Sequence, residues 1–366
     1  MRLIFLIGLR GKAAALLRSL GLVFLLAIVC FQVLTYFVSM LVGYSLFFVT
    51  PLGVEATQQV VEGFSFYVFL FPLYVPAPLS VGVFFTLIWV VFWVCLILSW
   101  IGPRLSFPEA VKLSFSAPLR QTARNYLFIF PLLASMLFTA EVAVKRLQET
   151  HGISTGALPF TNPFLLYFSA SHAAIIEELE FRLIPIGIVV AVIVFLEGKR
   201  KISEMNFRDI LKLFTLAFLY PDEAKRKARM VNVEEDGWLR GLTKAEWTIV
   251  LASSIGFGLA HILAGSGWGP GKFTLAFMAG LAFSWVYLAY GITASILLHW
   301  FHNYYLVTYW LGVNYSSYVF QTFTLASGLT IFLLGIGGWI TLAAYTAMRL
   351  IKERFRASRG TLDLQF

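Results

Sequence analysis

Residues 164–196 read FLLYFSASHAAIIEELEFRLIPIGIVVAVIVFL, an apolar run that is interrupted within six positions by four charged side chains, Glu177, Glu178, Glu180 and Arg182. A charged side chain near a membrane midplane costs at least about 2.5–3.5 kcal/mol, so such residues usually face a cavity, pair with one another and mark a functional site. Three carboxylates cannot all pair with one guanidinium. At least one is therefore expected to be neutral or open to water, as a general base in a membrane-embedded active site must be.

The composition is that of a membrane protein. Hydrophobic residues make up 59% of the 366 residues and charged residues 13%, and the mean hydropathy is +0.80. About 20 apolar residues span a bilayer core as a helix. The sequence predicts an all-α polytopic fold, one integral-membrane domain over residues 1–366 with about eight transmembrane helices that enclose an intramembrane cavity. The predicted spans are 21–49, 80–101, 126–144, 164–196, 247–264, 273–290, 292–311 and 319–348.

The net charge of +9 arises from basic residues that sort among the loops. Lys and Arg cluster before the first span, after the second, within residues 199–244 and after the last span, whereas residues 51–79 contain none. The positive-inside rule therefore predicts cytoplasmic termini, with Lys145 and Arg146 as a mild exception. We interpret the basic loops as topology signals that contact membrane lipids, and expect no nucleic-acid partner. The expected location is the plasma membrane of a prokaryote or the endoplasmic reticulum of a eukaryote.

Three segments depart from plain spans. Residues 64–78, which are aromatic and contain three prolines, suit an interfacial or re-entrant segment. Residues 198–245 form a charged insert, in which helical apolar spacing predicts an amphipathic helix over 207–218 on the cytoplasmic surface, followed by a solvated loop or short helix over 222–236. The fourth span is too long for one straight crossing, so a kink or a second short helix is expected at Pro185 and Gly187, just after the charged cluster. The apolar run of about 29 residues at the amino-terminal end is interpreted as a retained helix and not a cleaved signal peptide.

The two adjacent acids of the fourth span should have different roles. Glu177 and Glu178 project about 100° apart on a helix, so one environment cannot serve both. Glu178 precedes Arg182 by four residues, the favoured spacing for an ion pair on one helix face, which suits a supporting role. Glu177 has no local cation, and its partner is expected from another span.

Two other spans carry candidate partners. His261 lies four residues after Phe257, and His299 lies four residues before Asn303, so each pair shares a helix face, whereas His302 points elsewhere. A carboxylate, two imidazoles and an amide can hydrolyse a peptide bond: Glu177 would deprotonate a water held with the help of His261, and His299 with Asn303 would stabilise the oxyanion. The alternative is a buried polar network that only fixes helix packing.

Read in order, EExxxR, FxxxH and HxxxN resemble the motifs of the type II CAAX prenyl endopeptidase family, which includes CAAX proteases and bacteriocin-processing enzymes. The resemblance covers roughly residues 164–311. It implies a glutamate-dependent intramembrane protease without metal or other cofactor, with a lipidated or other membrane-associated peptide as substrate. In the best-known members cleavage removes the last three residues after a prenylated cysteine. Leu183, where many members have glycine, and the long insert leave the motif residues intact and the substrate open.

Other classes of membrane protein would carry sequence motifs of their own. A zinc protease could use Glu177, His261 and His299 as ligands, but no HExxH occurs. The GxSG element of rhomboid proteases is also missing, the four aspartates lie outside the predicted spans, and the halves show no repeat that would favour a transporter. Cys30 and Cys95 lie inside spans and predict neither a disulfide framework nor a metal site. A non-catalytic scaffold or immunity protein of the same family is the main alternative outside the enzymes.

Overall fold

The computed structural model describes residues 2–68, 71–198, 205–263, 267–315 and 318–362, and the side chains of these except 2–18, 315, 319 and 352–362. Residues 199–201 of the basic insert and Asp363 therefore lie outside the described part. Within it, seven helices are long and apolar enough to cross a membrane. This nearly all-helical architecture confirms the predicted polytopic integral membrane fold. The seven segments are Ser19–Val49, Val81–Ile101, Tyr126–Thr150, Pro163–Glu197, Lys244–Leu263, Gly271–Tyr290 and Phe320–Ile351.

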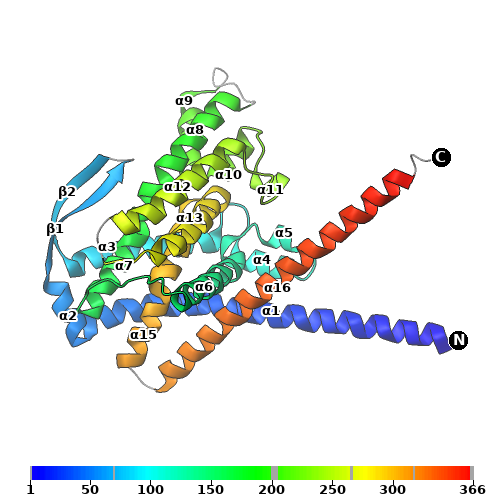
Figure 1. Cartoon of the computed structure of the whole chain (residues 1–366), viewed down its shortest axis with the longest axis horizontal. Coiled ribbons are helices and arrows are strands. Elements are labelled where there is room, and N and C mark those ends of the chain that lie inside the picture. The colour runs from blue at the N-terminus through cyan, green and yellow to red at the C-terminus, as the bar shows by residue number, and fades with distance from the viewer. Residues whose placement is uncertain (1, 69–70, 199–204, 264–266, 316–317, 363–366) are drawn as a thin grey trace.

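The first half of the chain contains three long helices and one hairpin. The long helices are α1 (Arg2–Val49), α3 (Val81–Ile101) and α6 (Tyr126–Thr150). The shorter elements are α2 (Pro51–Gln58), β1 (Val60–Val68), β2 (Phe71–Ser80), α4 (Phe107–Leu113) and α5 (Leu119–Thr122). Helix α1 and the last helix, α16 (Tyr318–Leu362), extend beyond the bundle on the same side, and the N- and C-terminal ends of the chain both lie there (Figure 1).

The fourth span is divided where the sequence predicts a break. Helix α7 (Pro163–Glu178) continues into the π-helical segment η1 (Leu179–Leu183) and then into α8 (Pro185–Glu197). Proline cannot donate a backbone hydrogen bond and clashes with the preceding turn, and the N–H of Ile184 bonds five residues back to the carbonyl of Leu179 at 3.0 Å. The predicted second short helix is present as α8, which begins at Pro185, and the acidic motif lies just before it.

The expected span 292–311 is also divided. It consists of α14 (Ile292–Trp300), the π-helical segment η3 (Phe301–Tyr305) and α15 (Leu306–Tyr315). Its pieces are 9, 5 and 10 residues long, and the stretch is not among the seven long, apolar helices. π-helical turns are rare and occur frequently at functional sites. Both π-helical segments in the described chain fall on predicted motif residues.

For residues 64–78 the sequence predicts an interfacial or re-entrant segment without giving its backbone form, and its placement at a membrane stays a prediction. These residues belong to an antiparallel hairpin in which Val60 lies opposite Ser80 and Val68 lies opposite Phe71. β1 is rich in β-branched and aromatic residues, which favour strands. The three prolines fall on β2, and proline is tolerated there because a two-stranded sheet leaves each strand one free edge. In Figure 1 the hairpin stands at one side of the helices, next to α3 and α7.

The charged insert contains the predicted amphipathic helix. Helix α9 (Phe207–Leu219) buries Leu213 and Ala217 and exposes Phe207 and Leu211. Its placement on a membrane surface stays a prediction. After it come α10 (Pro221–Lys227) and α11 (Val233–Asp236), and then the long helices α12 (Lys244–Leu263) and α13 (Gly271–Tyr290).

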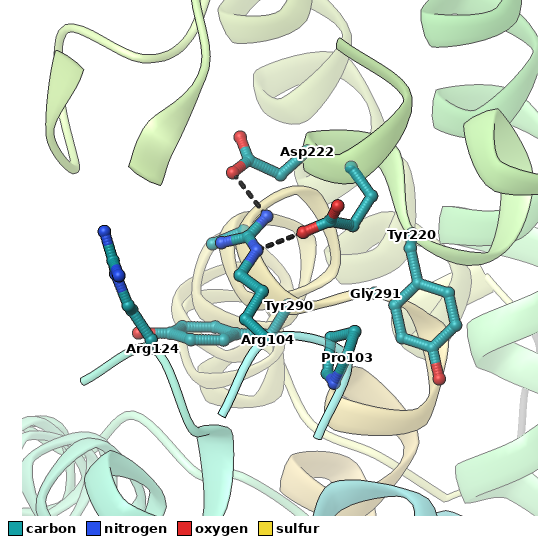
Figure 2. Close-up of a pocket in the computed structure, with 9 residues that line it drawn as sticks. Pro103, Arg104, Arg124, Tyr220, Asp222, Tyr290 and Gly291 are labelled. Atoms are coloured by element: carbon teal, nitrogen blue, oxygen red, sulfur yellow. Dashed lines mark hydrogen bonds and ion pairs between the residues drawn. The ribbon is translucent and has the colours of Figure 1, made fainter. Parts of the chain in front are cut away.

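The short helix expected over 222–236 is present as α10 and α11, but the expectation that this segment is solvated is wrong. Asp222 is 2% exposed and hydrogen-bonded to Arg104 at 2.8 Å, and the same guanidinium binds Glu223 and lies 3.0 Å from Glu234. Figure 2 shows Arg104 directed at Asp222, beside a small pocket bordered by Tyr290. Burial raises the pKa of the Glu223 carboxyl, but the hydrogen bonds and charges of Arg104 and Arg226 outweigh burial and hold that pKa below its usual value. The partner comes from a distant loop, so local charge pattern does not reveal it.

Candidate active site

Glu178 is the fully bonded carboxylate at the centre of the site. It ends α7, and its side chain is completely buried. Its Oε1 lies 3.1 Å from Nη1 of Arg182 and 2.9 Å from Nδ1 of His299, while Oε2 accepts a hydrogen bond from Ser295. The predicted ion pair between Glu178 and Arg182 is confirmed, and both partners are 0% exposed. Such a buried pair is tolerable only because other groups complete its hydrogen bonding.

Arg182 is held between aromatic rings. Its guanidinium lies 4.3 Å from the ring centroid of Phe257 and 5.2 Å from that of Phe283. Cation–π attraction strengthens when the cation is desolvated. Phe257, which the FxxxH pattern marks, therefore contacts the motif arginine directly. Phe283 also stacks on the His299 ring, with centroids 4.6 Å apart.

His299 connects the two acids and the amide. The ring is 2% exposed. Because Nδ1 faces the Glu178 carboxylate, we assign the proton of the neutral ring to Nδ1. Nε2 then accepts from the amide Nδ2 of Asn303 at 3.0 Å, and it lies 3.5 Å from Oε2 of Glu177. The structure thus brings Glu177, Glu178, His299 and Asn303 together across α7, α14 and η3.

Glu177 is the carboxylate without a hydrogen-bonded partner. Its side chain is 24% exposed, yet its Oε2 is buried and accepts no hydrogen bond from any described residue. The nearest ring nitrogen belongs to α14, as the prediction of a partner from another span requires. A buried polar oxygen left unbonded is costly, and a water or a substrate group is the usual means of satisfying it.

His261 lies one aromatic ring away from this group. Its Nδ1 lies 2.8 Å from the carbonyl oxygen of Phe257, which assigns the proton to Nδ1 and leaves Nε2 as an acceptor. The Phe257 ring contacts both imidazoles, with centroids 4.8 Å from His261 and 5.9 Å from His299. In the described residues His261 makes no hydrogen bond to Glu177.

The described residues contain no group of three His, Cys, Asp or Glu side chains placed to hold a metal ion. Glu177, His261 and His299, the ligands that a zinc site would require, are thus not arranged as one in this conformation.

Comparison with known families agrees with the motif pattern. Residues 159–305 match the family described as Type II CAAX prenyl endopeptidase Rce1-like. This region is similar to that family. The match runs from just before α7 to the end of η3 and includes every candidate residue. No curated protein and no solved structure matches the chain.

Several residues of the Rce1-like site escape the motif pattern. Ser295 donates to Glu178, and it could have been found because it lies four residues before His299 on the same helix face. His302 points away from the other motif groups, as predicted, and its Nε2 lies 2.9 Å from Oε2 of Glu141 on α6. Glu141 is a single charged residue within the predicted span 126–144, and Lys272 directly precedes the predicted span 273–290. An isolated charge in or next to an apolar span is the sequence feature that could have marked both as functional candidates.

Glu180 anchors the hairpin to the Rce1-like region. Its Oε1 accepts a hydrogen bond of 2.7 Å from the backbone N–H of Tyr67 in β1. This contact joins residues 113 positions apart, so the local sequence cannot show it. The third acid of the motif therefore has a structural partner of its own.

Replacement of Glu180 by Ala is expected to loosen the hairpin. A hydrogen bond to a charged group contributes about 1.5–3 kcal/mol, so proteolysis within residues 60–80 should accelerate about tenfold. The measurement is limited proteolysis of the detergent-solubilised chain followed by mass spectrometry. Glu62→Ala, which removes an exposed acid of the same strand, is the matched control. Equal cleavage rates in both variants would show that the Glu180 contact does not hold the hairpin.

Proposed function

We propose that this chain is a glutamate-dependent intramembrane endopeptidase. It would hydrolyse a peptide bond near the carboxyl terminus of a prenylated CAAX-like or other membrane-associated substrate. The observation that supports this most is the unbonded Oε2 of Glu177, 3.5 Å from a histidine that a second acid already orients. The match of residues 159–305 to the Rce1-like family adds the substrate class.

In the proposed reaction Glu177 acts as the general base. A water between Glu177 and His261 gives one proton to the Glu177 carboxylate and directs its other hydrogen to Nε2 of His261. The water oxygen forms a bond to the carbonyl carbon, and the negative charge moves to the carbonyl oxygen. When the C–N bond breaks, the leaving nitrogen takes the proton from Glu177, which returns to the carboxylate form. No covalent enzyme intermediate forms.

Asn303 is the proposed donor to the developing oxyanion. In the neutral tautomer assigned above, Nε2 of His299 accepts one amide hydrogen of Asn303, and the second amide hydrogen is available to the substrate. His299 therefore orients the donor, and it donates to the oxyanion itself only when protonated. Glu178, bonded to His299, Ser295 and Arg182, fixes this arrangement in a site of low dielectric.

The test is hydrolysis of a fluorogenic peptide that ends in a prenylated cysteine and three further residues. The purified full chain in liposomes is expected to release the terminal tripeptide, with unchanged rate in the presence of a chelator. In a single turnover in H₂¹⁸O, one ¹⁸O should enter the new carboxylate of the peptide and none the protein. Inhibition by chelator with recovery on adding zinc would favour the zinc protease. Absence of cleavage would favour a non-catalytic scaffold or immunity protein.

A further inference from the structure

We propose that Lys272 binds the free terminal carboxylate of the peptide substrate. This inference rests on the proposed function and adds a specificity residue to it. Lys272 lies in the first turn of α13, outside all three sequence motifs. Its partner is identified by chemistry alone, as an anionic group at the end of the leaving segment.

The packing of α13 against α12 places Lys272 on the His261 side of the site. The helices meet so closely at Gly258 that an added Cβ would lie 2.9 Å from the Phe273 ring. Small residues allow such close approach of helices in membranes. The charge of Lys272 consequently acts on both His261 and Glu177. The ammonium group is thus near the general base although it belongs to no motif.

The Lys272 ammonium is held without an acid in contact. Its Nζ lies 4.3 Å from the Trp268 ring centroid, and this ammonium group makes no ion pair or hydrogen bond with any described residue. The buried cations Arg182 and Lys225 behave differently, since each contacts a carboxylate at 3.1 Å or 2.8 Å. A cation near a membrane interior normally pairs, and an aromatic face alone compensates only part of its desolvation. Lys272 therefore has capacity for an anion in direct contact, which none of the described residues supplies.

The other charges around Lys272 leave this capacity open. Glu141 acts on Lys272 electrostatically, but its Oε2 is engaged by His302 at 2.9 Å. Lys145, which repels Lys272, is half exposed and lies 3.9 Å from Glu149. An arriving carboxylate would thus meet an ammonium group whose acidic neighbours, Glu141 and Glu177, are not in ion-pair contact with it.

The length of the leaving segment suits this arrangement. Three extended residues span at most about 10 Å, so a carboxylate at their end lies well beyond contact distance from the scissile bond. Lys272 is likewise beyond ion-pair contact with Glu177 but within the range of its charge. An ion pair between an ammonium group and a substrate carboxylate in a site that excludes water contributes more to selection between substrates than to affinity. The geometry points to selection of substrates by a free carboxyl terminus at a short distance from the cleaved bond.

The test compares two prenylated peptides that differ only in a free or an amidated carboxyl terminus. The full chain is expected to cleave the free acid with about tenfold to hundredfold higher kcat/KM. Lys272→Gln should remove the preference, so that acid and amide are cleaved with the same kcat/KM, while Lys272→Arg should retain it. Lys145→Gln is the matched control and should keep the preference of the unmodified chain.

The outcomes separate this inference from the proposed function. If the unmodified chain cleaves acid and amide equally, or if Lys272→Gln slows both substrates by the same factor, Lys272 acts on the chemistry and not on the carboxylate. If neither peptide is cleaved, binding of the prenyl-free tripeptide as acid and as amide, measured by quenching of tryptophan fluorescence, decides the matter. Tighter binding of the acid that is lost in Lys272→Gln supports the site, and equal binding of acid and amide overturns it.

Discussion

Replacement of Glu177 by Gln is expected to lower kcat for peptide hydrolysis by about 10²–10⁴-fold with little change in KM. Glutamine keeps the size and the hydrogen-bonding shape of the side chain but cannot accept a proton from water. The Oε2 of Glu177 has no hydrogen bond to lose within the described protein, so this substitution should leave the fold unchanged. The measurement is single-turnover cleavage of the prenylated peptide, with thermal unfolding of the same preparation to show an intact fold.

The matched control for Glu177→Gln is Glu180→Gln. Both acids belong to the same turn of the motif, but Glu180 is bonded to the N–H of Tyr67, and a glutamine oxygen can still accept from that group. We expect Glu180→Gln to retain kcat within about threefold, since it takes no part in proton transfer. If both variants lose kcat to a similar extent, the acids of the motif act through their summed charge. If Glu177→Gln keeps full activity, Glu177 is not the general base.

The sequence allows the membrane fold and the contacts along single helices to be predicted because both depend on local information. Apolar run length reports bilayer thickness, and four-residue spacing reports a shared helix face, which is how Glu178 with Arg182 and His299 with Asn303 were found. The break at Pro185 follows from the missing N–H of proline. Each of these properties belongs to a window of a few residues.

Contacts between distant segments could not be predicted in the same way. The bond of Tyr67 to Glu180, the pairing of Arg104 with Asp222 and the pairing of His302 with Glu141 depend on how helices are placed around one another. The hairpin cannot be predicted from local sequence for a related reason. Three prolines exclude a helix, but whether the segment lies in the interface or pairs with itself depends on the partner strand.

The site itself combines both kinds of information. Sequence spacing alone pairs Glu178 with Arg182, and that pair is present. The Glu178 carboxylate also accepts hydrogen bonds from His299 and Ser295 of α14. It is therefore more than the partner of a local ion pair, because it also orients the imidazole of His299. The tautomer that follows makes Asn303, and not neutral His299, the proposed donor to the oxyanion, a distinction that spacing cannot make.

Replacement of Arg182 by Met is expected to reduce the free energy of unfolding by about 3–5 kcal/mol, because it leaves a fully buried carboxylate without its cation. Methionine approximates the volume of the arginine stem and fits between Phe257 and Phe283, so a cavity would contribute little. The measurement is equilibrium unfolding in mixed micelles followed by circular dichroism. Arg146→Met is the matched control: that side chain is 80% exposed and 4.0 Å from Glu149, and its loss should cost less than about 1 kcal/mol.

The double variant Glu178→Gln with Arg182→Met decides whether charge is the cause. Removing both charges of a buried pair is commonly far less harmful than removing one, because no isolated ion is left in a medium of low dielectric. The double variant should therefore unfold at a higher temperature than Arg182→Met alone, although it gains no contact. It should nevertheless stay catalytically impaired, since a neutral glutamine in place of Glu178 no longer holds the imidazole of His299 as a carboxylate does. A double variant less stable than Arg182→Met would mean that Glu178 stabilises the helices mainly through His299 and Ser295, and that Arg182 is secondary.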